Sequence, residues 1–146
     1  MNDSERKSIE QECHDMVVRL THLSDHGERE KAVDMFTADG TWIRGGTPFK
    51  GREEMLKSFQ RGSQTQVIRH LTSNILITVK DDGHAEGVTY YIAFHTDPGT
   101  ATPKLPLELG PPFSLGEWHD KFQKTPHGWR VSHREVRRFF QHTGGH

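Results

Sequence analysis

Hydrophobic residues recur at three- and four-residue steps near the start of the chain, which is the spacing of an amphipathic helix. The apolar members of this stripe are Ile9, Cys13, Met16, Val17, Leu20 and Leu23. The stripe predicts a helix over residues 5–23 with Ser4 as its N-cap, but without a capping box because position 7 is lysine. Gly27 then interrupts the pattern, and a second, shorter helix is expected up to Phe36.

After the second helix the hydrophobic period changes to that of strands. Residues 41–50 predict a short strand, a Gly-Gly turn and a short return strand, and residues 51–62 predict a third helix. Four longer strands are expected at 66–80, 84–96, 115–125 and 129–140. Residues 97–114 are rich in proline and glycine and predict a long loop, acting either as a lid or as a plain connection. Helices followed by antiparallel strands indicate an α+β fold, with the helices on one face of a curved antiparallel sheet.

Composition narrows the class of protein. The length of 146 residues fits one domain, residues 1–146, for which we expect an ordered core over about residues 5–140. A net charge of -1 gives no electrostatic footprint for nucleic acid or an anionic membrane. No apolar run approaches a membrane span, the charged N-terminus does not resemble a secretory signal, and the single cysteine, Cys13, forms no intramolecular disulfide. We therefore expect a cytoplasmic protein that binds neither nucleic acid nor membrane.

Polar residues alternate along the first half of the strand at 66–80. Strict alternation puts His70, Thr72 and Asn74 on one face. The opposite face would then carry Leu71, Ile75, Ile77 and Val79. We expect the polar face to line a cavity under the helices, and the apolar face to be covered by further copies of the chain in a homodimer or homotrimer.

Asp25, in the break after the first helix, is a candidate partner for His70. In an Asp–His pair the carboxylate accepts a hydrogen bond from one ring nitrogen, fixes the tautomer and makes the other nitrogen a better base. Thr72 or Asn74 would then bind an oxyanion or anchor a substrate. Spacing alone leaves an alternative open, in which Asp25 caps the second helix and His70 is a hydrogen-bonded core residue.

Four aromatic residues are candidates for the wall of a pocket that binds a hydrophobic, ring-shaped small molecule, with plain core packing as the alternative for some of them. They are Trp42, Phe59, Tyr91 and Trp118. Arg44 either binds a substrate carboxylate or is only a residue of its turn without a functional contact. The histidines lack the spacing of metal ligands, so we expect no metal site. The arginines of residues 133–140 are expected on a solvated edge or a subunit contact.

Several short motifs, in order, make residues 8–138 resemble the SnoaL-like branch of the nuclear transport factor 2-like superfamily. They are Asp25 eleven residues before Phe36, Gly51-Arg52-Glu53, Arg69-His70 with Asn74, Gly116 with Trp118 and Asp120, and Gly128-Trp129-Arg130. The resemblance implies a cone-shaped α+β barrel around a deep apolar pocket. It also implies an Asp25–His70 dyad that works without a metal or organic cofactor, as in scytalone dehydratase, bile-acid 7α-dehydratase and hexachlorocyclohexane dehydrochlorinase. Polyketide cyclases of the SnoaL type are similar in fold.

The expected function is therefore a cofactor-independent lyase or isomerase, with dehydration as the first choice. The chain departs from scytalone dehydratase at Ser24, where that enzyme has a tyrosine that polarises the substrate carbonyl. Either a tyrosine from elsewhere replaces it, with Tyr91 and Tyr90 as the candidates, or the chain has no such group. Two alternatives stay open. One is a non-catalytic domain that binds a small molecule, and the other is a structural subunit like the small β chains of ring-hydroxylating dioxygenases.

Overall fold

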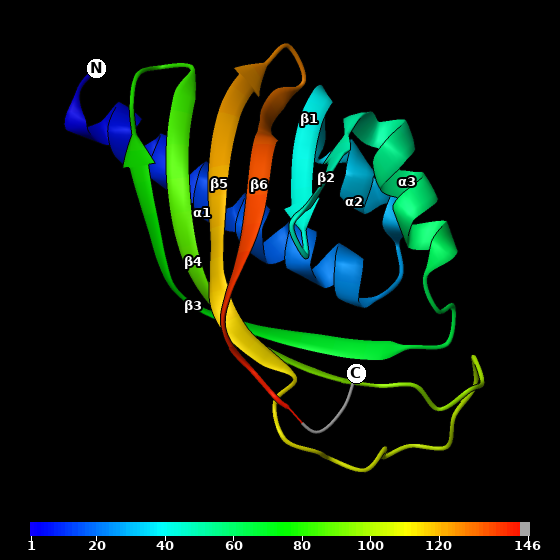
Figure 1. Cartoon of the computed structure of the whole chain (residues 1–146). Helices are drawn as coiled ribbons and strands as arrows, with labels where there is room; N and C mark the ends of the chain where they lie inside the picture. The colour runs from blue at the N-terminus through cyan, green and yellow to red at the C-terminus, as the bar shows by residue number, and fades with distance from the viewer. Residues whose placement is uncertain (144–146) are drawn as a thin grey trace.

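The computed structural model describes residues 1–143, which form three helices and six strands (Figure 1). In chain order these are α1 (Asp3–Asp25), α2 (Arg29–Asp34), β1 (Phe36–Arg44), β2 (Thr47–Lys50), α3 (Gly51–Arg61), β3 (Val67–Val79), β4 (His84–Thr96), β5 (Ser114–Thr125) and β6 (Gly128–Gln141). The predicted order of elements is confirmed. Helix α2 is shorter than expected, because Phe36 already starts β1.

The six strands form one curved, unclosed sheet in the order β2-β1-β6-β5-β4-β3. Helix α1 runs behind this sheet, while α2 and α3 lie beside β1 and β2 (Figure 1). The α+β prediction is confirmed, with one difference: β1 and β6 pair in parallel, whereas the other neighbours are antiparallel. Parallel neighbours need a long crossover, and here α3 with the β3–β5 strands supplies it.

Helix α1 starts earlier than Ser4 because Asn2 caps it. The Asn2 side chain accepts a hydrogen bond from the backbone N–H of Glu5, and the Glu5 carboxylate accepts one from the backbone N–H of Asn2. The sequence pattern favoured Ser4 as the cap, so the capping box of Asn2 and Glu5 was not predicted. The predicted stripe is buried against the sheet, with Cys13, Val17 and Leu20 fully inaccessible to solvent. Val17 and Leu20 each contribute about 1.5–3 kcal/mol through burial.

Strand β3 changes face in its middle, which overturns the prediction of strict alternation. The register with β4 shifts between Ser73 and Leu76, and Asn74 has a positive φ of 52°. Asparagine tolerates this left-handed conformation better than most residues. Beyond the bulge Ile75 and Ile77 pack against the core, while Leu76 is exposed. Figure 1 shows the result as a sharp turn between the two halves of β3.

The outer face of the sheet is consequently less apolar along β3 than predicted, but it carries an apolar row across four strands. Leu71, Ile92, Leu115 and Phe140 are successive register partners on β3, β4, β5 and β6. Leu71 and Phe140 are 60% and 68% exposed.

The segment between β4 and β5, residues 97–113, contains neither helix nor strand, as the composition predicted. It extends past the lower edge of the sheet in Figure 1, and its action as a lid stays a prediction. Within residues 1–143, no helix is both long and apolar enough to cross a membrane.

Candidate active site

Asp25 and His70 meet where the end of α1 crosses the first half of β3. The His70 backbone N–H donates to Asp25 Oδ2 over 2.8 Å, and His70 Nδ1 lies 2.6 Å from Asp25 Oδ1. Arg69 adds a third contact by donating from Nη1 to the Asp25 carbonyl oxygen over 3.2 Å. Asp25 is thus the last residue of α1 and not the cap of α2, whose N-cap position is occupied by Glu28.

The two hydrogen bonds determine what the imidazole can do. An ionised carboxylate only accepts hydrogen bonds, so Nδ1 carries the ring proton and the lone pair lies on Nε2. The Asp25 side chain is 4% exposed and that of His70 is 18% exposed. The carboxylate is therefore sealed behind the ring, and the ring edge remains accessible. This is the arrangement of an oriented general base.

Aromatic side chains from β4 and β5 hold the His70 ring. The ring centroids of Tyr91 and Trp118 lie 5.9 and 5.3 Å from that of His70, both edge-on, and the two aromatic rings stack on each other at 5.2 Å. Gly116 makes this stack possible. A Cβ at Gly116 would lie 2.0 Å from the Arg137 carbonyl oxygen and 3.0 Å from the Tyr91 ring, so only glycine fits.

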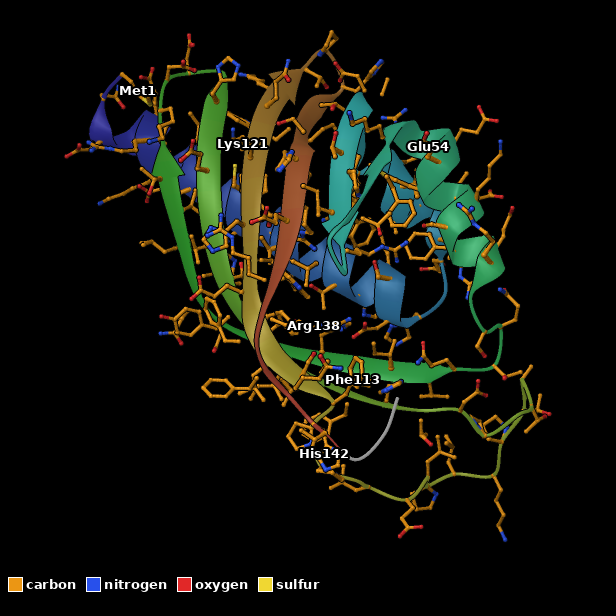
Figure 2. All side chains as sticks on the ribbon, in the orientation of Figure 1. Met1, Glu54, Phe113, Lys121, Arg138 and His142 are labelled. Atoms are coloured by element: carbon orange, nitrogen blue, oxygen red, sulfur yellow. The ribbon has the colours of Figure 1, made fainter. Side chains whose placement is uncertain are left out.

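A pocket with a volume of about 800 Å³ opens beside the dyad. This volume is in the range of roughly 300–1,000 Å³ that holds small organic ligands. The wall comes from the end of α1, from α2 and α3, and from strands β1 to β6. Figure 2 labels two wall residues, Arg138 and Phe113, in the lower part of the sheet near the first half of β3.

Six of the eight predicted site residues line this pocket. They are Asp25, His70, Trp42, Phe59, Tyr91 and Trp118. Thr72 is half-buried on the strand and is not part of the wall. Asn74 is exposed at the bulge, so the prediction that it faces the cavity is wrong. Of the two tyrosines, Tyr91 points inward at 3% exposure and Tyr90 points outward at 49%.

Sequence reasoning missed a buried ion pair under this wall. Arg134 donates two hydrogen bonds to Asp120, over 2.7 and 2.8 Å, and its guanidinium lies 4.5 Å from the Trp118 ring centroid. Arg134 is 2% exposed, which corrects the expectation of a solvated edge at this position. A second bulge explains the error, because the β5–β6 register shifts between Lys121 and Phe122 and moves the inward positions of β6 by one residue.

A different charge lies on the far wall of the pocket. The Arg44 guanidinium at the end of β1 lies over three aromatic rings, those of Trp42, Phe49 and Phe59, at 4.9, 4.9 and 4.5 Å. It donates a hydrogen bond to the Ser58 hydroxyl. No carboxylate among residues 1–143 pairs with it. Burial lowers the pKa of Arg44 from its ordinary value.

Metal ligands do not gather in the part of the chain that the structure describes: no three histidine, cysteine, aspartate or glutamate side chains cluster there in a way that could hold an ion. What the described residues do assemble is an α+β domain with a carboxylate-oriented histidine on the wall of an aromatic pocket.

The sequence profile of the SnoaL-like domain matches residues 5–135, so the chain belongs to this family of the nuclear transport factor 2-like superfamily. None of the curated proteins matches the chain.

Solved structures share the fold at low sequence identity. A scytalone dehydratase-like protein of Novosphingobium aromaticivorans is 17% identical, with a TM-score of 0.79 over 99% of this chain and 93% of that chain. Another protein of the same organism, nuclear transport factor 2-like with a cystatin-like fold, is 21% identical, with a TM-score of 0.71 over 97% and 84%. ActVI-ORFA of Streptomyces coelicolor is 16% identical, with a TM-score of 0.69 over 90% and 98%. At these identities the likeness establishes the fold.

Proposed function

We propose that the chain is a lyase or isomerase that acts on a small hydrophobic cyclic substrate, with dehydration as the leading reaction. One observation carries the proposal: Asp25 and His70 are hydrogen-bonded at 2.6 Å on the wall of a pocket large enough for such a substrate. Membership of the SnoaL-like family and the scytalone dehydratase-like structural neighbour support the same class of reaction.

His70 acts as the general base and Asp25 as the residue that positions it. Nε2 takes a proton from the carbon next to a substrate carbonyl, and the bonding electrons move into an enolate. When the enolate collapses, the β-hydroxyl group leaves, takes the proton back from Nε2 and departs as water. The same first step without a leaving group gives isomerisation or ring closure. The steps transfer a proton and release water without net oxidation or reduction, so the proposed reaction needs no cofactor.

Tyr91 is proposed to bind the carbonyl oxygen. Its ring lies beside His70, and Ser114 Oγ donates to the Tyr91 hydroxyl over 3.5 Å. A hydroxyl that accepts from Ser114 keeps its own proton for another acceptor. In the pocket that acceptor would be the oxygen on which negative charge develops. Trp42, Phe59 and Trp118 would supply the apolar surface for the rings of the substrate.

The test combines a binding screen with turnover. Cyclic β-hydroxyketones are screened for thermal stabilisation of the protein, because a ligand of the native state raises its stability. Each compound that binds is then followed by the ultraviolet absorbance of the conjugated enone that dehydration forms. We expect turnover by the wild type and a loss of about 10²- to 10⁴-fold in kcat for His70→Gln, which keeps the size of the side chain.

Binding and turnover together separate the alternatives. Equal turnover by His70→Gln would remove His70 from the mechanism. Ligands that bind without any turnover in the wild type would favour a non-catalytic binding domain. Purification only together with a larger iron protein would favour the structural subunit.

We further propose that a second copy of the chain covers the apolar row of the outer sheet face. This row is continuous over β3, β4, β5 and β6 and ends in two exposed side chains, Leu71 and Phe140. Sedimentation should show a dimer or trimer for the wild type and dissociation for Phe140→Glu. Leu109→Glu, on the exposed loop, is the matched control and should not dissociate. A monomeric wild type would contradict the proposal.

A further inference from the structure

The charges around the pocket are strongly unbalanced. Among the described residues, Asp25 is the sole carboxylate that lines the pocket, and it is already hydrogen-bonded to His70. Five arginines line the same space: Arg29, Arg44, Arg61, Arg134 and Arg138. Of these, Arg134 alone forms an ion pair within residues 1–143, with Asp120. The pocket therefore has a surplus of positive charge, although the chain as a whole carries a net charge of -1.

Arg44 is the arginine best placed to meet a ligand. Arg61 and Arg138 are exposed. Arg29 uses its donors on the Gln64 side chain and on the carbonyl oxygens of Phe59 and Ser63. Arg44 is half-buried and has one hydrogen bond, to Ser58, so most of its five donors are unused.

The surroundings of Arg44 make an anionic partner favourable. Three aromatic rings cover the guanidinium, so its remaining interactions must be made in its own plane. Arg44 Nε and the buried Trp42 Nε1 have no hydrogen-bond partner among the described residues. A charge removed from water is costly unless a counter-charge and hydrogen bonds compensate it. The lowered pKa of Arg44 has the same origin, because burial is its cause.

We infer that Arg44 binds a carboxylate of the substrate, and that the substrate is a cyclic carboxylic acid. This inference rests on the proposed function, because it treats the pocket as a substrate site. A carboxylate fits the planar edge of a guanidinium through two parallel hydrogen bonds. Arg44 on β1 and His70 on β3 lie on different walls, with β6, β5 and β4 between their strands in the sheet. The carboxylate therefore anchors one end of the substrate while His70 reaches a carbon at the other end.

The test compares two probes that differ in charge and hardly in shape, 2-naphthoate and 2-naphthamide. Their affinities are measured by isothermal titration calorimetry with the full chain at neutral pH. The wild type should bind the carboxylate about 10- to 100-fold more tightly than the amide, as expected for hydrogen bonds to a charged group. Arg44→Met, which keeps an apolar side chain between the rings, should abolish this preference. Arg44→Lys should retain part of it.

Two control variants locate the effect. Arg61→Met removes an exposed arginine of the same pocket and should keep the preference within about threefold, since an exposed charge contributes little. His70→Gln should keep it as well. Equal affinities of the two probes in the wild type, a preference that survives in Arg44→Met, or no binding of 2-naphthoate at millimolar concentration would each overturn the inference. None of these outcomes touches the proposed base, which the turnover of His70→Gln tests separately.

Discussion

Two walls of the pocket differ in whether their buried charges are paired within the chain. On the wall made by α1, β3, β5 and β6, each buried charge has a partner from this chain: Asp25 holds His70, and Asp120 holds Arg134. On the wall made by β1 and α3, Arg44 lies among aromatic rings and has no carboxylate. Arg44 and Arg134 make the contrast sharpest, because each guanidinium lies 4.5 Å from an aromatic centroid.

The difference separates structural charge from charge that is available to a ligand. The Asp120–Arg134 pair satisfies itself and supports Trp118, which in turn holds the His70 ring. The Asp25 carboxylate determines the tautomer of its partner and leaves one ring nitrogen facing the pocket. Arg44 has a charge and unused donors, but no acceptor of matching charge. The role of an arginine that lies over an aromatic ring therefore depends on whether a carboxylate of the same chain pairs with it.

The largest expected effect concerns the wall made by α1, β3, β5 and β6, which we call the paired wall because each of its buried charges has a partner. In Asp25→Asn the side-chain oxygen can still accept from the His70 backbone N–H, but the amide now donates to Nδ1. The lone pair moves to Nδ1 and the proton to Nε2, so the base loses its function with little change in shape. We expect kcat to fall about 10²- to 10⁴-fold. Nitrogen-15 NMR of the histidines should show the changed tautomer, which would link the loss of activity to the orientation of the imidazole and not to a loss of fold.

The next largest effect is on stability. Arg134→Met leaves Asp120 buried without a partner and should lower the free energy of unfolding by about 3–5 kcal/mol, measured by urea denaturation. The double variant Arg134→Met/Asp120→Leu removes both charges and should recover most of this loss. A single variant as stable as the wild type would mean that the pair contributes nothing to the paired wall.

A much smaller effect is expected on the opposite wall. Arg44→Met loses cation–π contacts with three rings but also relieves an uncompensated buried charge. The free energy of unfolding should stay within about 1 kcal/mol of the wild type under the same urea assay. A loss as large as that of Arg134→Met would show that Arg44 has a structural role and would erase the contrast between the walls.

The smallest effect concerns a buried group that stays neutral. Burial first, and then the charges of Glu12 and Asp120, raise the pKa of the Cys13 thiol to about 12. A pKa above the working pH keeps the thiol protonated, and the thiolate is the reactive form. Cys13 of the native protein should therefore not react with a thiol reagent at pH 8, and it should react fully after unfolding. Labelling of the native protein would contradict the burial of this residue.

Most of the fold was predictable because local periodicity and local structure agree. Strand β4 is the clearest case, since it alternates without a bulge and turns Tyr91 inward and Tyr90 outward. The α1 stripe behaves in the same way. Strand β3 contains a register shift, and beyond it Ile75 and Ile77 pack against the core although strict alternation predicted them on the outer face. A register shift in β6 brings Arg134 inside, where a solvated edge was expected.

A local signal for the β3 bulge was present in the sequence. Strict alternation would place three β-branched residues on the outer face, where exposing them to solvent costs free energy. A change of phase at Asn74 turns them inward and removes that cost. Asparagine is one of the residues that tolerate a positive φ. The β6 shift that buries Arg134 has no comparable signal, because the charges of residues 133–138 fit either phase.

The site itself depended on contacts between distant segments. Asp25 and His70 are 45 residues apart, and nothing in either segment alone brings them together. The break after α1 and the polar face of β3 made the pairing a candidate, and the resemblance to the SnoaL-like family favoured it over a capping role for Asp25 and a core role for His70. The resemblance assigned no role to Arg44 or Arg134, whose different roles depend on whether a carboxylate lies within reach, and only tertiary structure determines that.

Hydrogen–deuterium exchange in a bound ligand tests most directly whether His70 removes a proton from carbon. A cyclic ketone that stabilises the protein is incubated in D₂O, and loss of the proton next to the carbonyl is followed by proton NMR. Dehydration, isomerisation and cyclisation all begin with this step, so the measurement does not depend on which reaction follows. We expect the wild type to catalyse the exchange, and we expect the rate to fall to the uncatalysed value in His70→Gln. Undiminished exchange in a folded His70→Gln protein would contradict the role of His70 as the base.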